Sequence, residues 1–284
     1  TGPPHSLHLI GLKLKQLHPV RWIADFRDPW TQIGYHKKLM LSSFAKKKHQ
    51  TLEATVLNAA DELVVTSLQT KQLFSKLTNT AITVITNGFD FEITNSSTLD
   101  SKFTLSHIGS LLEGRNPQIL WKVLSNLVKE STEFSSAFQL NLIGSVSSNV
   151  MDSIGSFGLE NHIQNHGYVS HTDALEFQKN AQLLLLIEEN SKETEYIIPG
   201  KLFEYMASKR PIIAIGPNTS DIEKIINQTN SGTYFRYDNE DLLRTTLRAH
   251  FEAFKTQQLR ANSKGLEMYS RKFLTKQLAK KILT

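Results

Sequence analysis

Residues 182–215 read QLLLLIEENSKETEYIIPGKLFEYMASKRPIIAI, and this stretch decides the fold. A continuous apolar run over Gln182–Ile187 has the length of a strand, and a second run follows at Pro211–Ile215. Between them lie a polar loop and a segment of helical period over Lys201–Ser208. A strand that is apolar at every position is typical of a parallel sheet covered by helices on both faces. The stretch therefore predicts a βαβ unit.

The same alternation continues along nearly the whole chain and predicts an α/β fold with parallel sheets. The other expected strands are Arg21–Asp25, Glu62–Thr66, Ile82–Thr86, Thr104–Gly109 and Gln139–Gly144, and the alternating segment Asn161–Val169 indicates a further strand entering a loop. The other expected helices are His5–Leu17, Tyr35–Ala59, Leu68–Leu77, Pro117–Glu130, Thr172–Lys179, Ser220–Gln228, Glu240–Thr256 and Ser270–Leu283.

A domain boundary is expected within Asp90–Lys102. The polar run Thr94–Thr98 follows the turn signal Asn87-Gly88 and precedes a new strand. We therefore divide the chain into a first unit over residues 1–93 and a second over residues 94–268. The first unit begins with a Gly-Pro-Pro loop that leads directly into a helix, so we expect it to lack its N-terminal part.

Composition excludes several classes of site and leaves the partner open. The chain has no cysteine, which excludes a disulfide framework, a thiolate zinc site and a cysteine nucleophile. The formal net charge of +5 fits an anionic partner. The densest basic run, Lys46–Lys48, indicates either a solvated helix face or a patch that binds a membrane surface. No apolar run approaches the length of a membrane span, so we expect a cytoplasmic protein, with peripheral membrane association as an open alternative.

The segment around Gly200 has the chemistry of a phosphate site. A helix that starts here leaves the carboxyl end of a parallel sheet, where free N–H groups and the helix dipole favour an anion. Gly200 lets a ligand approach the backbone, Lys201 adds a positive charge, and Glu204 lies about one turn further on. The alternative is that Pro199 and Gly200 only end the loop and that Glu204 is a capping carboxylate.

Two more segments are expected as loops at the carboxyl ends of strands. The first is His107–Pro117, in which the Arg115 guanidinium suits a phosphate, although a surface arginine is the alternative. The second is Trp22–Trp30, and the opening loop Thr1–Ser6 that precedes it is expected at the same place in the fold. A metal site formed by His162 and His166 is not favoured, because those residues lie in the alternating segment.

The run Gly200–Ala207, followed by Lys209–Ala214, resembles the donor-site signature of family-4 type bacterial glycosyltransferases, which have the GT-B architecture of two Rossmann-like domains. The resemblance implies that Glu204 binds the nucleotide ribose. It also implies that Gly200, Lys201 and Leu202 lie beside the donor diphosphate. Many relatives carry a further glutamate eight positions earlier that contacts the transferred sugar, but this position is Tyr196 here, and Glu195 is out of register.

Other loops extend the resemblance over nearly the whole chain. Gly109, Ser110 and Arg115 match the first loop of the nucleotide domain, although Ser110 replaces the usual arginine. The terminal segment, residues 269–284, is similar to the helix that crosses back to the first domain.

The Asp25–Trp30 run and the opening loop resemble the acceptor-side loops of a bacterial subset of this family. On that resemblance Asp25, Arg27 and Asp28 are candidate catalytic residues, and Pro4 and His5 are candidate acceptor-side residues. An ion pair between Arg27 and an aspartate that only shapes the loop is the alternative.

The resemblance implies a retaining sugar transfer from a nucleotide-diphosphate sugar to an acceptor hydroxyl, in cell-surface polysaccharide or glycolipid synthesis. It implies a saccharide or lipid-linked acceptor, no bound cofactor and no nucleic-acid partner. Metal-independent chemistry agrees with the lack of an Asp-x-Asp motif. Two alternatives stay open: a nucleotide-sugar epimerase of the same architecture, and a non-catalytic nucleotide-sugar-binding or scaffold protein.

Overall fold

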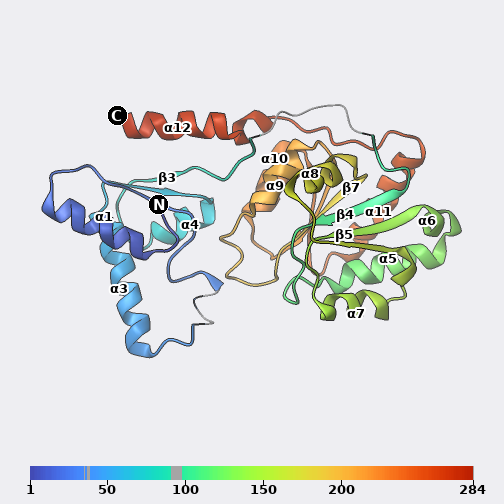
Figure 1. Cartoon of the computed structure of the whole chain (residues 1–284), viewed down its shortest axis with the longest axis horizontal. Helices are drawn as coiled ribbons and strands as arrows, with labels where there is room; N and C mark the ends of the chain where they lie inside the picture. The colour runs from blue at the N-terminus through green and yellow to red at the C-terminus, as the bar shows by residue number, and fades with distance from the viewer. Residues whose placement is uncertain (35, 37–38, 91–97, 284) are drawn as a thin grey trace.

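The computed structural model describes residues 1–34, 36, 39–90 and 98–283, which form two α/β units joined along the chain (Figure 1). The first unit contains α1 (Ser6–Leu17), β1 (Ile23–Phe26), α3 (Ser43–Ala59), β2 (Glu62–Val65), α4 (Leu68–Phe74) and β3 (Ile82–Val84). The second contains β4 (Phe103–Ile108), α5 (Gln118–Glu130), α6 (Thr132–Ala137), β5 (Phe138–Ile143), α7 (Ser148–Ser156), β6 (Ile163–Gly167), α8 (His171–Asn180), β7 (Leu183–Ile187), α9 (Gly200–Ala207), β8 (Ile212–Gly216), α10 (Asp221–Thr229), β9 (Gly232–Arg236) and α11 (Glu240–Lys255). A last helix, α12 (Arg271–Leu283), follows the second unit.

The six-stranded sheet of the second unit has the order β6-β5-β4-β7-β8-β9, and all its strands are parallel. This is the strand order of a doubly wound Rossmann sheet, in which the order reverses between the first and fourth strands. The first unit has a parallel sheet of order β1-β2-β3. The predicted fold class, α/β with parallel Rossmann-like sheets, is confirmed.

The apolar run of β7 is buried on both faces, as the sequence predicts. Alternate side chains of a strand point to opposite faces. Leu183 and Leu185 therefore pack with α5 and α11 in one core cluster, and Leu184 and Leu186 pack with α9 and α10 in another. The central strand thus joins the two hydrophobic layers of the second unit.

The expected helix Tyr35–Ala59 is not continuous, because residues 39–42 are not helical. Helix α3 begins at Ser43, where the Ser42 hydroxyl accepts a hydrogen bond from the Ala45 N–H at 3.2 Å. This N-cap starts a new helix, and the positive φ of Met40 (48°) is not that of a right-handed helix. Residues 35, 37 and 38 of that expected helix, and the proposed boundary between residues 93 and 94, lie outside the described residues.

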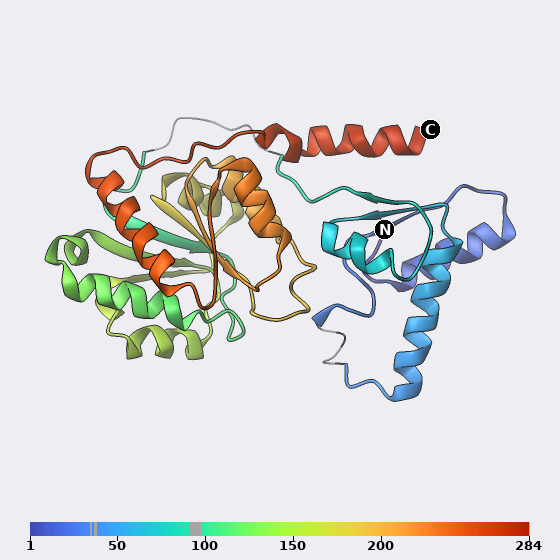
Figure 2. The same cartoon turned by 180° about the vertical axis from the view of Figure 1, so that it is seen from behind.

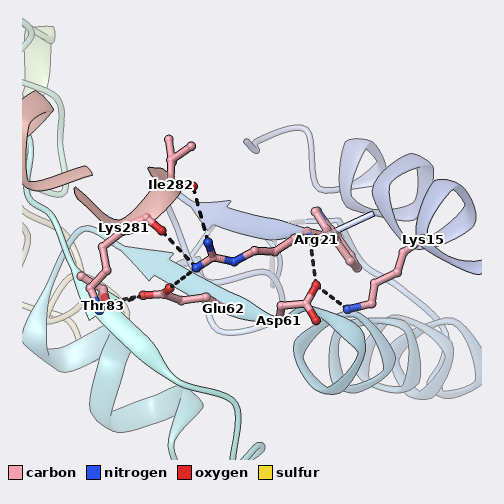
Figure 3. A network of polar contacts seen from close by, with 8 residues as sticks. Lys15, Arg21, Asp61, Glu62, Thr83, Lys281 and Ile282 are labelled. Atoms are coloured by element: carbon pink, nitrogen blue, oxygen red, sulfur yellow. Dashed lines mark hydrogen bonds and ion pairs between the residues drawn. The ribbon is translucent and has the colours of Figure 1, made fainter. Parts of the chain in front are cut away.

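Helix α12 returns to the first unit, and polar contacts hold its end there (Figures 1 and 3). The Arg21 guanidinium donates to the carbonyl oxygens of Lys281 and Ile282 at 3.0 and 3.4 Å, which gives partners to carbonyls that a helix end leaves free. The carboxylate of Glu62 lies 3.6 Å from Arg21 and 3.4 Å from the Lys281 ammonium, and it accepts a bond from Thr83. None of the helices that the structure describes combines the length and the apolar character of a membrane span.

Burial of β7 on both faces has a measurable consequence. We expect Leu184→Ala and Leu185→Ala each to lower the free energy of unfolding by about 2–5 kcal/mol, because each removes a fully buried side chain and leaves a cavity. Leu242→Ala, at a half-exposed position of α11, should change it by no more than about 0.5 kcal/mol. Urea denaturation measures all three. If one of the two neighbouring leucines behaved like Leu242, one face of the strand would not be packed as described.

Candidate functional site

The candidate site lies where β4 and β7, neighbours in the sheet, end. Ligands of doubly wound sheets bind in the crevice beyond the carboxyl ends of the strands at the point where the strand order reverses, which here lies between β4 and β7. The loop after β4 contains Gly109, Ser110 and Arg115, and the loop after β7 leads to α9. The topology therefore brings two sequence-predicted segments to one place.

Tyr205 fixes α9 against the end of β4. Its fully buried hydroxyl accepts a hydrogen bond from the Ile108 N–H at 2.9 Å and lies 3.3 Å from the Ile108 carbonyl oxygen. The Leu202 side chain is also fully buried in the core, and its N–H donates to the Pro199 carbonyl oxygen at 3.1 Å. The sequence motif thus combines residues that anchor the helix with residues that face the crevice.

Lys201 lies over the backbone of Gly109. A Cβ atom at Gly109 would be 3.1 Å from the Lys201 Nζ, and the φ of Gly109 is +114°, so a larger residue is disfavoured on both counts. Gly200 is exposed at the start of α9, and a Cβ atom there would meet nothing within 4 Å. Pro199, the N-cap residue, makes no side-chain capping bond. The N–H groups of Gly200 and Lys201 therefore lack an acceptor among the described residues and lie beside an ammonium group.

Glu188 is a member of this site that the sequence analysis missed. It directly follows β7, its side chain is 1% exposed, and its Oε2 lies 3.3 Å from the Arg115 guanidinium. Its Oε1 is buried and has no hydrogen-bond partner among the described residues. The one available signal was a carboxylate placed directly after a fully apolar strand.

Burial sets the protonation of these groups. Burial lowers the pKa of the Lys201 ammonium to about 8, although the nearby carboxylates of Glu188 and Glu204 act in the opposite direction. Burial also raises the pKa of the Glu188 carboxyl, against the pull of Arg115 and Lys201. Both shifts are caused first by the loss of water around the groups, and the attraction between the opposite charges offsets them only in part.

Glu204 lies on α9 one turn after Gly200. Its carboxylate is half-buried and accepts a hydrogen bond from the Gln178 amide at 3.2 Å. Ser110 is exposed. Gly109, Arg115, Glu188, Lys201 and Glu204 are therefore grouped beyond the carboxyl ends of β4 and β7, and we call them the donor-side cluster.

The acceptor-side candidates lie at the end of β1 in the first unit. Asp25 accepts a bond from the Thr1 hydroxyl at 2.6 Å and lies 3.9 Å from the Arg27 guanidinium, which also donates to the Asn87 amide oxygen. These contacts fit the alternative in which Arg27 shapes the loop. Burial raises the pKa of the Asp28 carboxyl, partly opposed by Arg27. In the described part of the chain, no hydrogen bond holds the Asp28 carboxylate.

His5 is buried and uncharged near neutral pH. Its ring stacks on Trp30 with the centroids 5.4 Å apart, and burial, with a smaller effect from His36, lowers its pKa to about 4. Neither ring nitrogen has a partner among the residues described. Pro4 is exposed beside it. A neutral imidazole with free nitrogens suits a hydroxyl group better than an anion.

Glu53, on α3, supports this loop and was also missed by the sequence analysis. Its buried carboxylate accepts bonds from the N–H groups of Trp30 and Thr31 at 3.0 and 3.2 Å, and from the Thr31 hydroxyl at 2.5 Å. Glu53 follows Lys48 by five residues in an otherwise ordinary helix, so no local pattern indicated it. Its role depends on contacts that span more than twenty residues of sequence.

The two groups of candidates lie on different sheets. Two hydrogen bonds link the start of α4 in the first unit to the second unit. The Ser67 hydroxyl donates to the Tyr196 carbonyl oxygen at 2.9 Å, and the Gln69 N–H donates to the Asp221 carboxylate at 3.0 Å. Among the described residues, no hydrogen bond or ion pair joins the donor-side cluster to Asp25, Arg27, Asp28 or His5. Likewise, no group of three or more His, Asp or Glu residues in the described ranges is arranged to hold a metal ion.

Comparison with known proteins identifies the family and the fold. The family described as "Glycosyl transferases group 1" matches residues 102–250, just over half of the chain, and this range contains the whole donor-side cluster. No curated protein matches the sequence.

Solved structures of glycosyltransferases resemble the whole chain at low sequence identity. Sucrose-phosphate synthase from Thermosynechococcus elongatus has a TM-score of 0.67 and 13% identity, with 97% of this chain and 70% of that chain covered. Anabaena HepE in complex with UDP has a TM-score of 0.65 and 14% identity, with coverage of 97% and 75%. The pneumococcal O-GlcNAc transferase GtfA, in complex with UDP and GlcNAc, has a TM-score of 0.62 and 18% identity, with coverage of 83% and 47%.

The chain thus spans between about half and three quarters of the length of these proteins, and at such identities the likeness shows the fold alone. It is the two-domain GT-B fold of Rossmann-like units. Because the family match covers the sheet, the crevice and α9 together, the chain belongs to the group 1 glycosyl transferases.

Proposed function

We propose that the protein transfers a sugar from a nucleotide-diphosphate sugar to an acceptor hydroxyl, with retention at the anomeric carbon, as in family-4 type enzymes. The observation that carries the proposal is the position of Lys201 over Gly109, at the start of α9 and near Arg115. Positive groups arranged in advance around a leaving group are the largest source of rate acceleration in many enzymes. Here two cations and a helix start meet where a diphosphate would leave.

In this proposal the side chains replace a metal ion. Lys201 and Arg115 neutralise the leaving diphosphate, Gly109 and Gly200 let it approach the backbone, and no cofactor takes part. When the diphosphate binds, it takes over from Glu188 as the partner of Arg115. Glu204, held by Gln178, binds the ribose. Uridine is the proposed base, since two of the structural neighbours are complexes with UDP.

The acceptor side of the proposal uses the loop after β1. Asp28, whose carboxylate is free of hydrogen bonds in the described part of the chain, receives the acceptor hydroxyl. Arg27 and Asp25 hold the loop, and Pro4 and His5 line the acceptor side. We propose a saccharide or lipid-linked acceptor at the cytoplasmic face of a bacterial membrane, in polysaccharide or glycolipid synthesis.

The proposed division of the chain follows from these roles. Residues 1–93 are the acceptor-side domain, residues 94–268 are the nucleotide-sugar domain, and residues 269–284 are the helix that returns to the first domain.

A second candidate is a protein that binds the nucleotide sugar without turnover. Tyr196 stands where many relatives have the glutamate that contacts the sugar, and Ser110 stands in the place of an arginine. Release of UDP from UDP-sugars in the presence of acceptor saccharides separates the two functions. Epimerisation of the donor without any acceptor would instead identify an epimerase.

Nucleotide binding tests the donor-side cluster. Calorimetric titration with UDP, GDP, ADP and CMP should show saturable binding of UDP. Lys201→Ala and Glu204→Ala should each weaken it by about 1–3 kcal/mol, because each removes a hydrogen bond to a charged group. The matched controls are Lys129→Ala at the exposed end of α5 and Glu160→Ala, which should bind as the parent does. Equal binding by all four variants would refute the assignment.

The pH dependence of binding tests Lys201 by itself. The ammonium attracts the diphosphate, and a bound anion raises its pKa, so binding favours the protonated form. In the protein without nucleotide the pKa of Lys201 is about 8, so the protonated fraction of this side chain falls about tenfold between about pH 7 and about pH 9. The affinity for UDP should fall by the same factor. Lys201→Arg, which stays charged, should show no such fall. A parent protein with the same affinity at both pH values would contradict the role of Lys201.

Turnover tests Asp28. We expect Asp28→Asn to lower kcat by about 10²–10⁴-fold, the usual contribution of a group that handles the proton of a reacting hydroxyl, and to leave the Kd for UDP unchanged. UDP release from a UDP-sugar and acceptor saccharides gives kcat, and calorimetry gives the Kd. An unchanged kcat would remove Asp28 from the catalytic residues.

A further inference from the structure

The outer end of α3 carries a surface that is both apolar and basic. Leu39, Met40 and Phe44 are 54%, 92% and 80% exposed. Beside them, the three exposed lysines Lys46, Lys47 and Lys48 follow within one turn. We call these six residues the α3 tip. Large apolar side chains that cluster on a surface among charges are typical of an interaction site.

The α3 tip lies beyond the core of the first unit. The buried side chains of α3 are Glu53, Val56 and Leu57, all in its second half. Its first turns bury none, and they project away from the sheet in both views (Figures 1 and 2). On one helix face, Phe44, Lys47, Lys48 and Thr51 border a hollow of about 410 Å³ together with Leu52. No part of the fold explains this combination of residues.

The charge of the α3 tip is not neutralised locally. Residues 29–52 contain no aspartate or glutamate. Among the described residues, Lys46, Lys47 and Lys48 take part in no ion pair. A second copy of the chain is a poor occupant, because a two-fold contact would bring the same lysines face to face. This surface therefore fits a binding partner whose outer layer is anionic and whose interior is apolar.

We propose that the α3 tip docks the protein on an anionic lipid bilayer. Met40, Phe44 and Leu39 enter the boundary between headgroups and acyl chains, and the lysines bind lipid phosphates. The proposal deepens the proposed function and rests on it only for the lipid-linked acceptor. Glu53 of the same helix holds Trp30 and Thr31, so a docked α3 carries the acceptor-side loop at the membrane.

The test is co-sedimentation of the full 284-residue chain with vesicles of phosphatidylcholine alone or with about 30% phosphatidylglycerol. We expect binding to the anionic vesicles only, weaker at about 0.5 M salt than at about 0.05 M. One lysine contributes about fivefold to such partitioning, so replacing Lys46, Lys47 and Lys48 by Gln should weaken binding about 100-fold. The double variant Met40→Ser, Phe44→Ser should lose the part of the vesicle binding that the parent protein keeps at about 0.5 M salt.

The matched control replaces Lys102, Lys129 and Lys264 by Gln, three exposed lysines of the second unit, which changes the net charge equally. Failure of the parent to bind anionic vesicles would overturn the inference, as would equal loss in both triple variants. Retention on heparin without vesicle binding would assign the tip to a soluble polyanion instead. UDP titration of the same samples separates the two proposals, because vesicle binding can fail while UDP binding is intact, and the reverse.

Discussion

The parallel pairing of β4 with β7 is the constraint on which the site depends. These strands are distant in sequence but adjacent at the centre of the sheet, and their crossover helices lie on opposite faces. Their outgoing loops therefore diverge and leave a crevice. The Tyr205 hydroxyl then fixes α9 to the end of β4, which brings Lys201 over Gly109. A slip of one residue between these strands would exchange the faces of every side chain and separate the two loops.

The buried charges at the ends of β4 and β7 do not by themselves stabilise the fold. Burying a lysine and a glutamate costs solvation that their mutual attraction rarely returns in full. The lowered pKa of Lys201 and the raised pKa of Glu188 both reflect this uncompensated cost. If their mutual attraction had exceeded the cost of burial, the pKa of Lys201 would have been raised and the pKa of Glu188 lowered instead.

Sequence patterns predicted the parts of the fold that depend on local physics. Continuous apolar strands such as β7 and β8 were placed within about two residues, since each must be buried on both faces. Strand β9 was missed because Gly232 and the charged Arg236 interrupt its apolar pattern. The α3 start was misplaced because the helical period continued through the Ser42 cap.

Motifs indicated Lys201 and Glu204, because helix starts at sheet ends have recognisable sequences. Glu188, Glu53 and the contact between Arg27 and Asn87 were beyond such reasoning. Each depends on a partner more than twenty residues away, and no local pattern encodes the distance between two loops.

The two units are joined by polar contacts and by one small apolar cluster, which has consequences for the site. Hydrogen bonds from Ser67, Gln69 and Arg21 cross between the units or reach α12, and Leu274 and Leu278 of α12 pack on apolar side chains of the first unit. Interfaces of this kind are weaker than a hydrophobic core and permit relative domain motion. The Ser67 contact falls on Tyr196, four residues before Gly200. A movement of the first unit therefore acts directly on the loop that leads into α9.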